Sequence, residues 1–189
     1  MNLPNKLSLL RIILIPVMVA VFYITAIPYR FLIAAIIFAI AALTDFLDGY
    51  IARKYNLVTD LGKFLDPIAD KILVLSALVI TLTEPSLISG RFGELFGKLS
   101  GGIGVTIIVA REMTVSVLRM LAASKGKVLA AENVGKIKTF TTDFAILFIL
   151  LSGDFSFFWY AGIPLYMISV ALTVYSGVFY IVKNREVFN

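Results

Sequence analysis

Four aspartates in otherwise apolar sequence are the residues best suited to chemistry. They occur in the run Asp45-x-x-Asp48-Gly49-x-x-Ala52-Arg53 and, eight residues later, in the run Gly62-x-x-x-Asp66-x-x-x-Asp70. Spacings of three and four residues put the two carboxylates of each run on one face of a helix. A charged carboxylate at the centre of a membrane helix costs about 2.5 to 3.5 kcal/mol, so four of them need a cation nearby. Because oxygen ligands suit Mg²⁺ and Mn²⁺, the pattern predicts a divalent metal site.

The composition indicates that these acids lie in a membrane protein. Hydrophobic residues make up 60% of the 189 positions and charged residues 15%, and the mean hydropathy is +0.96. The chain has no cysteine and no histidine, which excludes thiolate nucleophiles, Ser-His-Asp triads and the usual zinc ligands. The net charge of +5 fits an anionic lipid surface or an anionic substrate, whereas so apolar a chain argues against nucleic acid.

The elements that position the acids are apolar runs long enough to cross a bilayer. A transmembrane helix needs about 20 residues, and the apolar runs of that length predict an all-α integral membrane protein with six transmembrane helices and a short interfacial N-terminal segment. These form a single domain of residues 1–189, and the expected helices cover residues 10–27, 31–53, 62–83, 102–123, 136–152 and 160–182. No small-residue cleavage site follows the first run, so we expect a retained helix rather than a signal peptide. Proline and several glycines in residues 84–102 predict an interfacial or partly re-entrant loop.

The basic residues predict the orientation of these helices. Most lysines and arginines fall on the side of the N-terminus, and only Arg30, Arg91 and Lys98 fall on the other side. The positive-inside rule then puts both termini in the cytoplasm, with the chain in the cell membrane. With a rise of about 1.5 Å per residue, the two antiparallel acidic runs match in depth, Asp48 with Asp66 and Asp45 with Asp70. We therefore expect a polar cavity that faces the cytoplasm.

The two acidic runs together resemble the signature of the CDP-alcohol phosphotransferase family. That signature is D-x-x-D-G-x-x-A-R, eight residues, then G-x-x-x-D-x-x-x-D, and every fixed position is filled in this chain. The resemblance implies transfer of a phosphatidyl group from CDP-diacylglycerol to an alcohol, with release of CMP. It implies two divalent metals, Mg²⁺ or Mn²⁺, held by Asp45, Asp48, Asp66 and Asp70, with Asp70 also acting as the base. By the same likeness, the CDP-binding pocket is shaped by Gly49, Ala52, Arg53 and Gly62.

A second, basic set resembles one subgroup of that family, the phosphatidylglycerophosphate synthases. Its members are Arg111, Arg119, Lys136 and Lys138, in the runs A-R-E-M-T-V-S-V-L-R and N-V-G-K-I-K-T. The resemblance implies that the acceptor is glycerol 3-phosphate, whose dianionic phosphate suits a cluster of fixed cations. The N-terminal run P-N-K-L-S-L-L-R also resembles the subgroup, with Ser8 in place of threonine. Thr142 departs from it, because related enzymes often have glutamine there.

Structural readings of both sets remain open. Arg111 could form an intramembrane ion pair with Glu112, and the other three cations could be topology markers or head-group contacts. Asp143 is expected to pair with one of these cations. For the four aspartates, a set of purely structural ion pairs is disfavoured, because Arg53 and Lys71 cannot match four acids.

Several functions are compatible with these patterns. The favoured one is a membrane enzyme that uses CDP-diacylglycerol and glycerol 3-phosphate, and family likeness suggests a homodimer. A sister enzyme with another acceptor, such as inositol phosphate, serine, choline or phosphatidylglycerol, is the second. A cation transporter is the alternative from a different class, since intramembrane acids commonly mark ion paths. A prenyltransferase is less favoured because D-D-x-x-D-like clusters are absent.

Overall fold

Helices make up all the regular structure in the part of the chain that is described. The computed structural model describes residues 2–55, 59–89, 94–127, 129 and 133–188. The α-helices are α1 (Leu3–Tyr23), α2 (Arg30–Lys54), α3 (Asp60–Thr83), α4 (Pro85–Ser89), α5 (Glu94–Ser124), α6 (Asn133–Ser152) and α7 (Trp159–Lys183). A short 3-10 helix at Ser156–Phe158 precedes α7, and another at Arg185–Phe188 follows it. The six long helices correspond to the six that the apolar runs predict.

The protein is a multi-pass membrane protein. Among the described residues, four helical stretches are long and apolar enough to cross a bilayer: Leu3–Tyr23, Arg30–Ile51, Leu99–Ser124 and Ser156–Lys183. The helices α3 and α6 are not in this set, because the charged residues of the predicted site lie on them. The all-helical membrane fold is thus confirmed, with four of the expected spans identified by length and composition.

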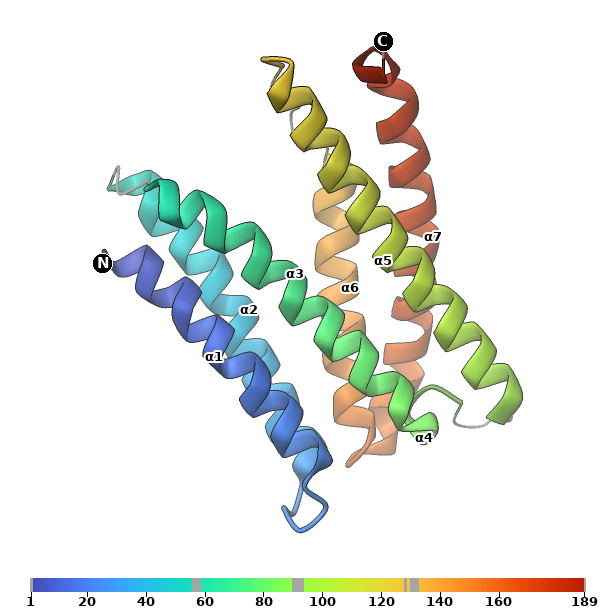
Figure 1. Cartoon of the computed structure of the whole chain (residues 1–189). Coiled ribbons are helices and arrows are strands. Elements are labelled where there is room, and N and C mark those ends of the chain that lie inside the picture. Colours follow the sequence, from blue (N-terminus) through green and yellow to red (C-terminus); the bar gives the residue numbers. More distant parts are fainter. Residues whose placement is uncertain (1, 56–58, 90–93, 128, 130–132, 189) are drawn as a thin grey trace.

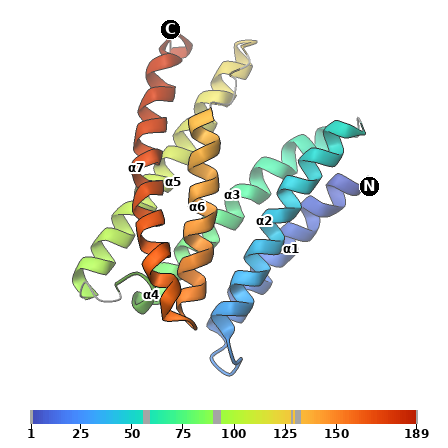
Figure 2. The same ribbon diagram turned by 180° about the vertical axis from the view of Figure 1, so that it is seen from behind.

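The long helices form two groups that diverge toward one end of the molecule. In one group, α1 packs against both α2 and α3, and in the other, α5 and α6 both pack against α7. The groups approach each other near α4 and spread apart toward the end that holds both termini (Figure 1). The view from behind shows the same separation between α2 and the α6–α7 pair (Figure 2). Contacts of α2 with α6 and of α3 with α5 join the groups.

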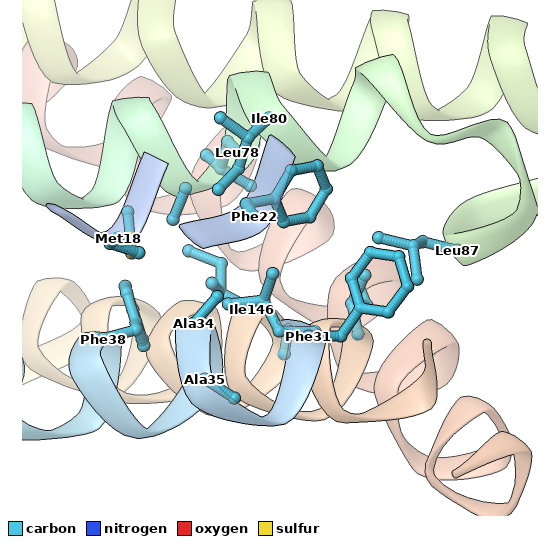
Figure 3. Packing of buried hydrophobic residues seen from close by; sticks show 14 of the residues in the cluster. Met18, Phe22, Phe31, Ala34, Ala35, Phe38, Leu78, Ile80, Leu87 and Ile146 are labelled. Carbon is cyan, nitrogen blue, oxygen red and sulfur yellow. The ribbon is translucent and has the colours of Figure 1, made fainter. Parts of the chain in front are cut away.

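A tightly packed apolar core holds the narrow end together. Figure 3 shows side chains from both groups meeting there, among them Met18 and Phe22 of α1, Phe31 and Phe38 of α2, Leu87 of α4 and Ile146 of α6. The rings of Phe22 and Phe31 meet edge to face, with centroids 5.3 Å apart. Small buried residues of α2, including Ala34 and Ala35, let neighbouring helices approach closely, which is how helices associate in lipid.

Two helices begin earlier than the sequence predicts. The first begins at Leu3 rather than residue 10, because the Asn2 side chain accepts a hydrogen bond from the Asn5 amide at 3.2 Å and caps its start. The expected interfacial segment is therefore the first turns of α1. The expected loop of residues 84–102 is wrong from Glu94 onward, where α5 has begun. Gly101 serves packing instead: a Cβ there would lie 3.1 Å from both Leu82 Cδ2 and Ile88 Cδ1.

Candidate functional site

The first acidic run is bound by an arginine from α1. Arg11 Nη1 lies 2.8 Å from Asp45 Oδ1, and Arg11 Nη2 donates to Asp48 Oδ2 at 2.6 Å. The Arg11 Nε also donates to the backbone carbonyl of Ala41 at 3.2 Å. Arg11 and Asp48 are buried, whereas the Asp45 side chain is 43% exposed. Arg11 lies in the N-terminal run P-N-K-L-S-L-L-R, but that run alone did not predict that Arg11 is the cation of this acidic pair.

The second acidic run is also tied to α1. Ser8 Oγ donates to Asp66 Oδ1 on α3. One turn earlier, Asn5 Oδ1 accepts a hydrogen bond from Thr59 Oγ1, and the same Thr59 oxygen caps α3 by accepting from the Gly62 amide, both at 3.0 Å. Asn5, Ser8 and Arg11 are spaced by three residues, so one face of α1 reaches both acidic runs. That spacing is the sequence signal that could have revealed their role.

The glycine at position 62 is explained by this close approach of α1. A Cβ added to Gly62 would lie 2.9 Å from Asn5 Oδ1 and 3.2 Å from Thr59 Oγ1. Any larger residue would therefore separate α1 from the start of α3. The predicted role of Gly62 in a nucleotide pocket stays a prediction. The same holds for Gly49, which follows Asp48 on α2, and for Ala52 and Arg53, whose side chains lie outside the described part of the structure.

A cavity of about 750 Å³ lies where the two groups of helices diverge. Asp45 of α2 and Asp70 of α3 both line it, as their predicted common depth requires, whereas Asp48 and Asp66 do not. No hydrogen bond or ion pair joins the Asp70 carboxylate to another described residue. Several aromatic rings also line the cavity: Phe38, Phe46, Phe140, Phe144 and Phe179. Charged and apolar lining together suit an amphiphilic molecule.

The predicted basic set is divided between this cavity and an ion-pair cluster. Arg111 Nη1 lies 3.0 Å from Glu112 Oε1, and Lys138 Nζ donates to the same oxygen. The intramembrane ion pair considered for Arg111 is therefore present, although Arg111 and Glu112 also line the large cavity. Lys138 is buried and lines a small adjoining hollow together with Asp70 instead. Lys138 thus lies behind the large cavity rather than on its wall.

The other two predicted cations lie on the cavity wall. Arg119 Nε donates to Tyr180 Oη at 3.1 Å, and its guanidinium stands 5.5 Å from the centre of the Tyr180 ring. Lys136 is exposed at the start of α6, and no hydrogen bond or ion pair joins its ammonium to a described residue. Arg111, Arg119 and Lys136 therefore present positive charge to the same cavity as Asp45 and Asp70.

Close packing against α7 fixes the stem of Arg111. A Cβ added to Gly177 would lie 2.9 Å from Arg111 Cγ, so the absence of a side chain at position 177 makes room for the arginine. Arg111 Nε is buried and has no hydrogen-bond partner among the described residues. A buried donor without a partner indicates a place where a bound oxygen atom would be favourable.

Asp143 and Thr142 of α6 differ in their contacts. Asp143 lines both the large cavity and the small hollow, and no ion pair or hydrogen bond joins it to a described residue. The expected pairing of Asp143 with a cation is therefore not seen in the described structure. Thr142 is buried and donates to the Lys138 carbonyl of its own helix at 2.8 Å.

The acids fit a hard divalent cation by their chemistry. Asp45, Asp48, Asp66 and Asp70 supply only carboxylate oxygens, which are the ligands that Mg²⁺ and Mn²⁺ prefer. Among the described residues, no three acids converge on one point in their present rotamers. Asp45 and Asp48 turn toward Arg11, and Asp66 turns toward Ser8. These pairs use one oxygen of each carboxylate and leave its other oxygen for a metal.

Comparisons with known proteins agree with this arrangement. The sequence model of the CDP-alcohol phosphatidyltransferase family matches residues 1–178. The chain is 40% identical to the CDP-diacylglycerol--glycerol-3-phosphate 3-phosphatidyltransferase of Bacillus subtilis, over 98% of this chain and 96% of the relative. It is 37% identical to the protein of that name from Rickettsia bellii, over 99% and 97% of the two chains. For the protein of that name from Salmonella typhimurium, the identity is 36%, over 97% and 95%.

Proposed function

Because the chain belongs to the CDP-alcohol phosphatidyltransferase family, we propose that it transfers the phosphatidyl group of CDP-diacylglycerol to sn-glycerol 3-phosphate. The products are phosphatidylglycerophosphate and CMP. Nearly full-length relatives named for this reaction support the choice of acceptor. The structural observation that carries it is the single cavity lined by Asp45 and Asp70 together with Arg111, Arg119 and Lys136. Acids and phosphate-binding cations within one cavity suit a reaction between two phosphate compounds.

We assign the metal-ligand role to Asp45, Asp48, Asp66 and Asp70. When bound, two divalent cations would stabilise the negative charge on the attacking and leaving oxygens of a displacement at phosphorus. The carboxylate oxygens that Arg11 and Ser8 leave unused support this role. Magnesium and manganese both suit such oxygen ligands.

The chemical step is displacement at the phosphatidyl phosphorus. The acceptor hydroxyl oxygen forms a bond to this phosphorus while the bond to the bridging pyrophosphate oxygen breaks, and CMP leaves with that electron pair. Asp70 takes the proton of the attacking hydroxyl, which is the work of a general base. Its position on the cavity lining, without a partner among the described residues, supports this assignment.

The two substrates divide the remaining residues between them. We assign the CDP moiety to Gly49, Ala52, Arg53 and Gly62, where an arginine can form paired hydrogen bonds to a phosphate. The acceptor phosphate is assigned to Arg111, Arg119, Lys136 and Lys138. Of these four, Arg111, Arg119 and Lys136 stand on the cavity wall, and Lys138 acts through Glu112 and the small hollow. The aromatic lining suits the apolar part of the lipid donor.

We further propose that all six long helices cross the membrane, with both termini and the cavity on the cytoplasmic side. The charges of α3 and α6 lie toward the wide end, where the acids and cations meet water-soluble substrates. The excess of lysine and arginine on that side supports the orientation. Family likeness also suggests a homodimer, and the mass of the detergent-solubilised protein measured by light scattering tests this.

An acceptor panel with purified protein tests the proposed function. The protein is incubated with CDP-diacylglycerol, Mg²⁺ and one acceptor at a time, and CMP release is measured. We expect release with glycerol 3-phosphate and little with inositol phosphate, serine, choline or phosphatidylglycerol. A preference for inositol phosphate would move the assignment to a sister enzyme. Absence of CMP release with every acceptor would contradict the transferase function altogether.

A further inference from the structure

The inner face of α1 carries a polar stripe, which we define as Asn5, Ser8 and Arg11. Their exposed fractions are 4%, 0% and 0%, so all three are enclosed by protein. Each contacts one part of the acidic array: Asn5 the start of α3, Ser8 the second acidic run, and Arg11 the first. The two acidic runs are therefore held relative to each other by one helix that belongs to neither.

The contacts of the stripe use only one of the two oxygens of each carboxylate that they reach. Arg11 uses Asp45 Oδ1 and Asp48 Oδ2, and Ser8 uses Asp66 Oδ1. The other oxygens, Asp45 Oδ2, Asp48 Oδ1 and Asp66 Oδ2, have no hydrogen bond to a described residue. A metal-binding carboxylate is commonly held by a hydrogen bond on one oxygen, so that its other oxygen points to the metal. The stripe supplies hydrogen bonds to Asp48 and Asp66 and an ion pair to Asp45.

Arg11 is not free to leave the array. Its guanidinium is fully buried, and its Nε is fixed to the Ala41 carbonyl at 3.2 Å. Withdrawing it would leave a buried cation without its anions, which is strongly unfavourable. The planar guanidinium reaches two carboxylates and a carbonyl at once, and a lysine ammonium on a flexible stem cannot reproduce that fork.

We propose that Arg11 and Ser8 are positioning residues, which hold Asp45, Asp48 and Asp66 in the orientation that binds divalent cations and stay in place when the cations bind. This inference rests on the metal site of the proposed function. Ser8 Oγ also lies 3.1 Å from the Pro4 carbonyl, but its single proton goes to the carboxylate, which is the stronger acceptor. Arg11 additionally offsets part of the negative charge while no metal is bound.

Direct Mn²⁺ binding tests this role without any substrate. Free Mn²⁺ is measured by its electron paramagnetic resonance signal as it is titrated into the full-length protein in detergent. We expect Arg11→Lys, which keeps the charge but loses the fork, to raise the Kd by about 10- to 100-fold. Ser8→Ala, which removes only one hydroxyl, should raise it by about tenfold. Circular dichroism establishes that each variant is folded before its Kd is measured.

Two matched variants at other places in the fold serve as controls. Arg30→Lys alters a half-buried arginine that binds Glu84 at 3.2 Å, and Ser152→Ala removes a hydroxyl that donates to the Ile149 carbonyl. Both should bind Mn²⁺ with the affinity of the unaltered protein. If Ser8→Ala and Arg11→Lys are both folded and both bind Mn²⁺ with unchanged affinity, the positioning role is overturned. Tighter binding in Arg11→Lys would also overturn it, because Arg11 would then compete with the metal. If the unaltered protein binds no Mn²⁺, the metal site of the proposed function fails as well.

Discussion

At the scale of single residues, the four aspartates have unequal surroundings. Asp45 and Asp48 are held by Arg11 and Asp66 by Ser8, whereas Asp70 faces the cavity without a described partner. A carboxylate that no neighbour occupies can accept a proton. We therefore predict that Asp70→Asn lowers turnover by about 10²- to 10⁴-fold while CMP and metal still bind. Calorimetric CMP binding at saturating Mg²⁺, measured beside the rate of CMP release, checks this.

Asp48→Asn is the comparison for that experiment. It removes a proposed metal ligand that Arg11 contacts, so CMP binding should weaken at ordinary Mg²⁺ concentrations. If Asp70→Asn keeps substantial turnover, or loses CMP binding as Asp48→Asn does, Asp70 is only a fourth ligand.

Metal removal should stop the reaction reversibly. Among the described residues, Arg11 forms ion pairs with two of the four carboxylates, so substrate phosphates would be repelled by the others without metal. We predict that excess chelator abolishes CMP release and that added Mg²⁺ or Mn²⁺ restores it. Full turnover in chelator would exclude the metal role.

The two lysines of α6 should respond differently to substitution. Lys136 stands on the cavity wall without an ion pair to a described residue, and losing one charge-assisted contact to phosphate costs about 1.5 to 3 kcal/mol. Lys136→Ala should therefore raise the KM for glycerol 3-phosphate by roughly 10- to 100-fold and leave that for CDP-diacylglycerol nearly unchanged. Lys138→Ala should instead lower the Tm, because the half-buried Glu112 loses one of its two cations. Equal KM changes for both substrates in Lys136→Ala would indicate a structural role.

At the scale of elements, close packing between α5 and α7 positions Arg111. A methyl group at position 177 would press on Arg111 Cγ, and such overpacking costs about 1 to 3 kcal/mol. We predict that Gly177→Ala displaces the guanidinium and raises the KM for glycerol 3-phosphate. Gly102→Ala on α5 is the control, because a Cβ there meets nothing within 4 Å; it should leave the KM unchanged and should not lower the Tm, since Ala favours a helix over Gly. A Gly177→Ala enzyme with normal KM would show that Arg111 tolerates the shift.

The elements themselves could largely be predicted from the sequence, and their contacts could not. Apolar runs revealed all six long helices because bilayer thickness sets their length. The starts of α1 and α5 were missed because a cap at Asn2 and glycine packing at Gly101 depend on local geometry and on neighbours. Arg11 and Asp48 are 37 positions apart, so their pairing requires knowing that α1 lies against α2. The signature located the acids, whereas the N-terminal run P-N-K-L-S-L-L-R did not by itself show that Ser8 and Arg11 contact them.

At the scale of the whole molecule, the proposed function requires that the wide end of the helix arrangement face the compartment that holds glycerol 3-phosphate. Both termini and the turn after α5 lie at that end, and the turn before α7 lies at the other (Figure 1). Because the chain has no cysteine, single cysteines can report each side without background. We predict that a membrane-impermeant maleimide applied to intact cells labels Ser156→Cys, and labels Lys127→Cys only after permeabilisation. Both positions are exposed in the structure, so a difference in labelling reflects the side of the membrane rather than burial. The reverse pattern would put the cavity outside the cell, where cytoplasmic CDP-diacylglycerol and glycerol 3-phosphate could not enter it together.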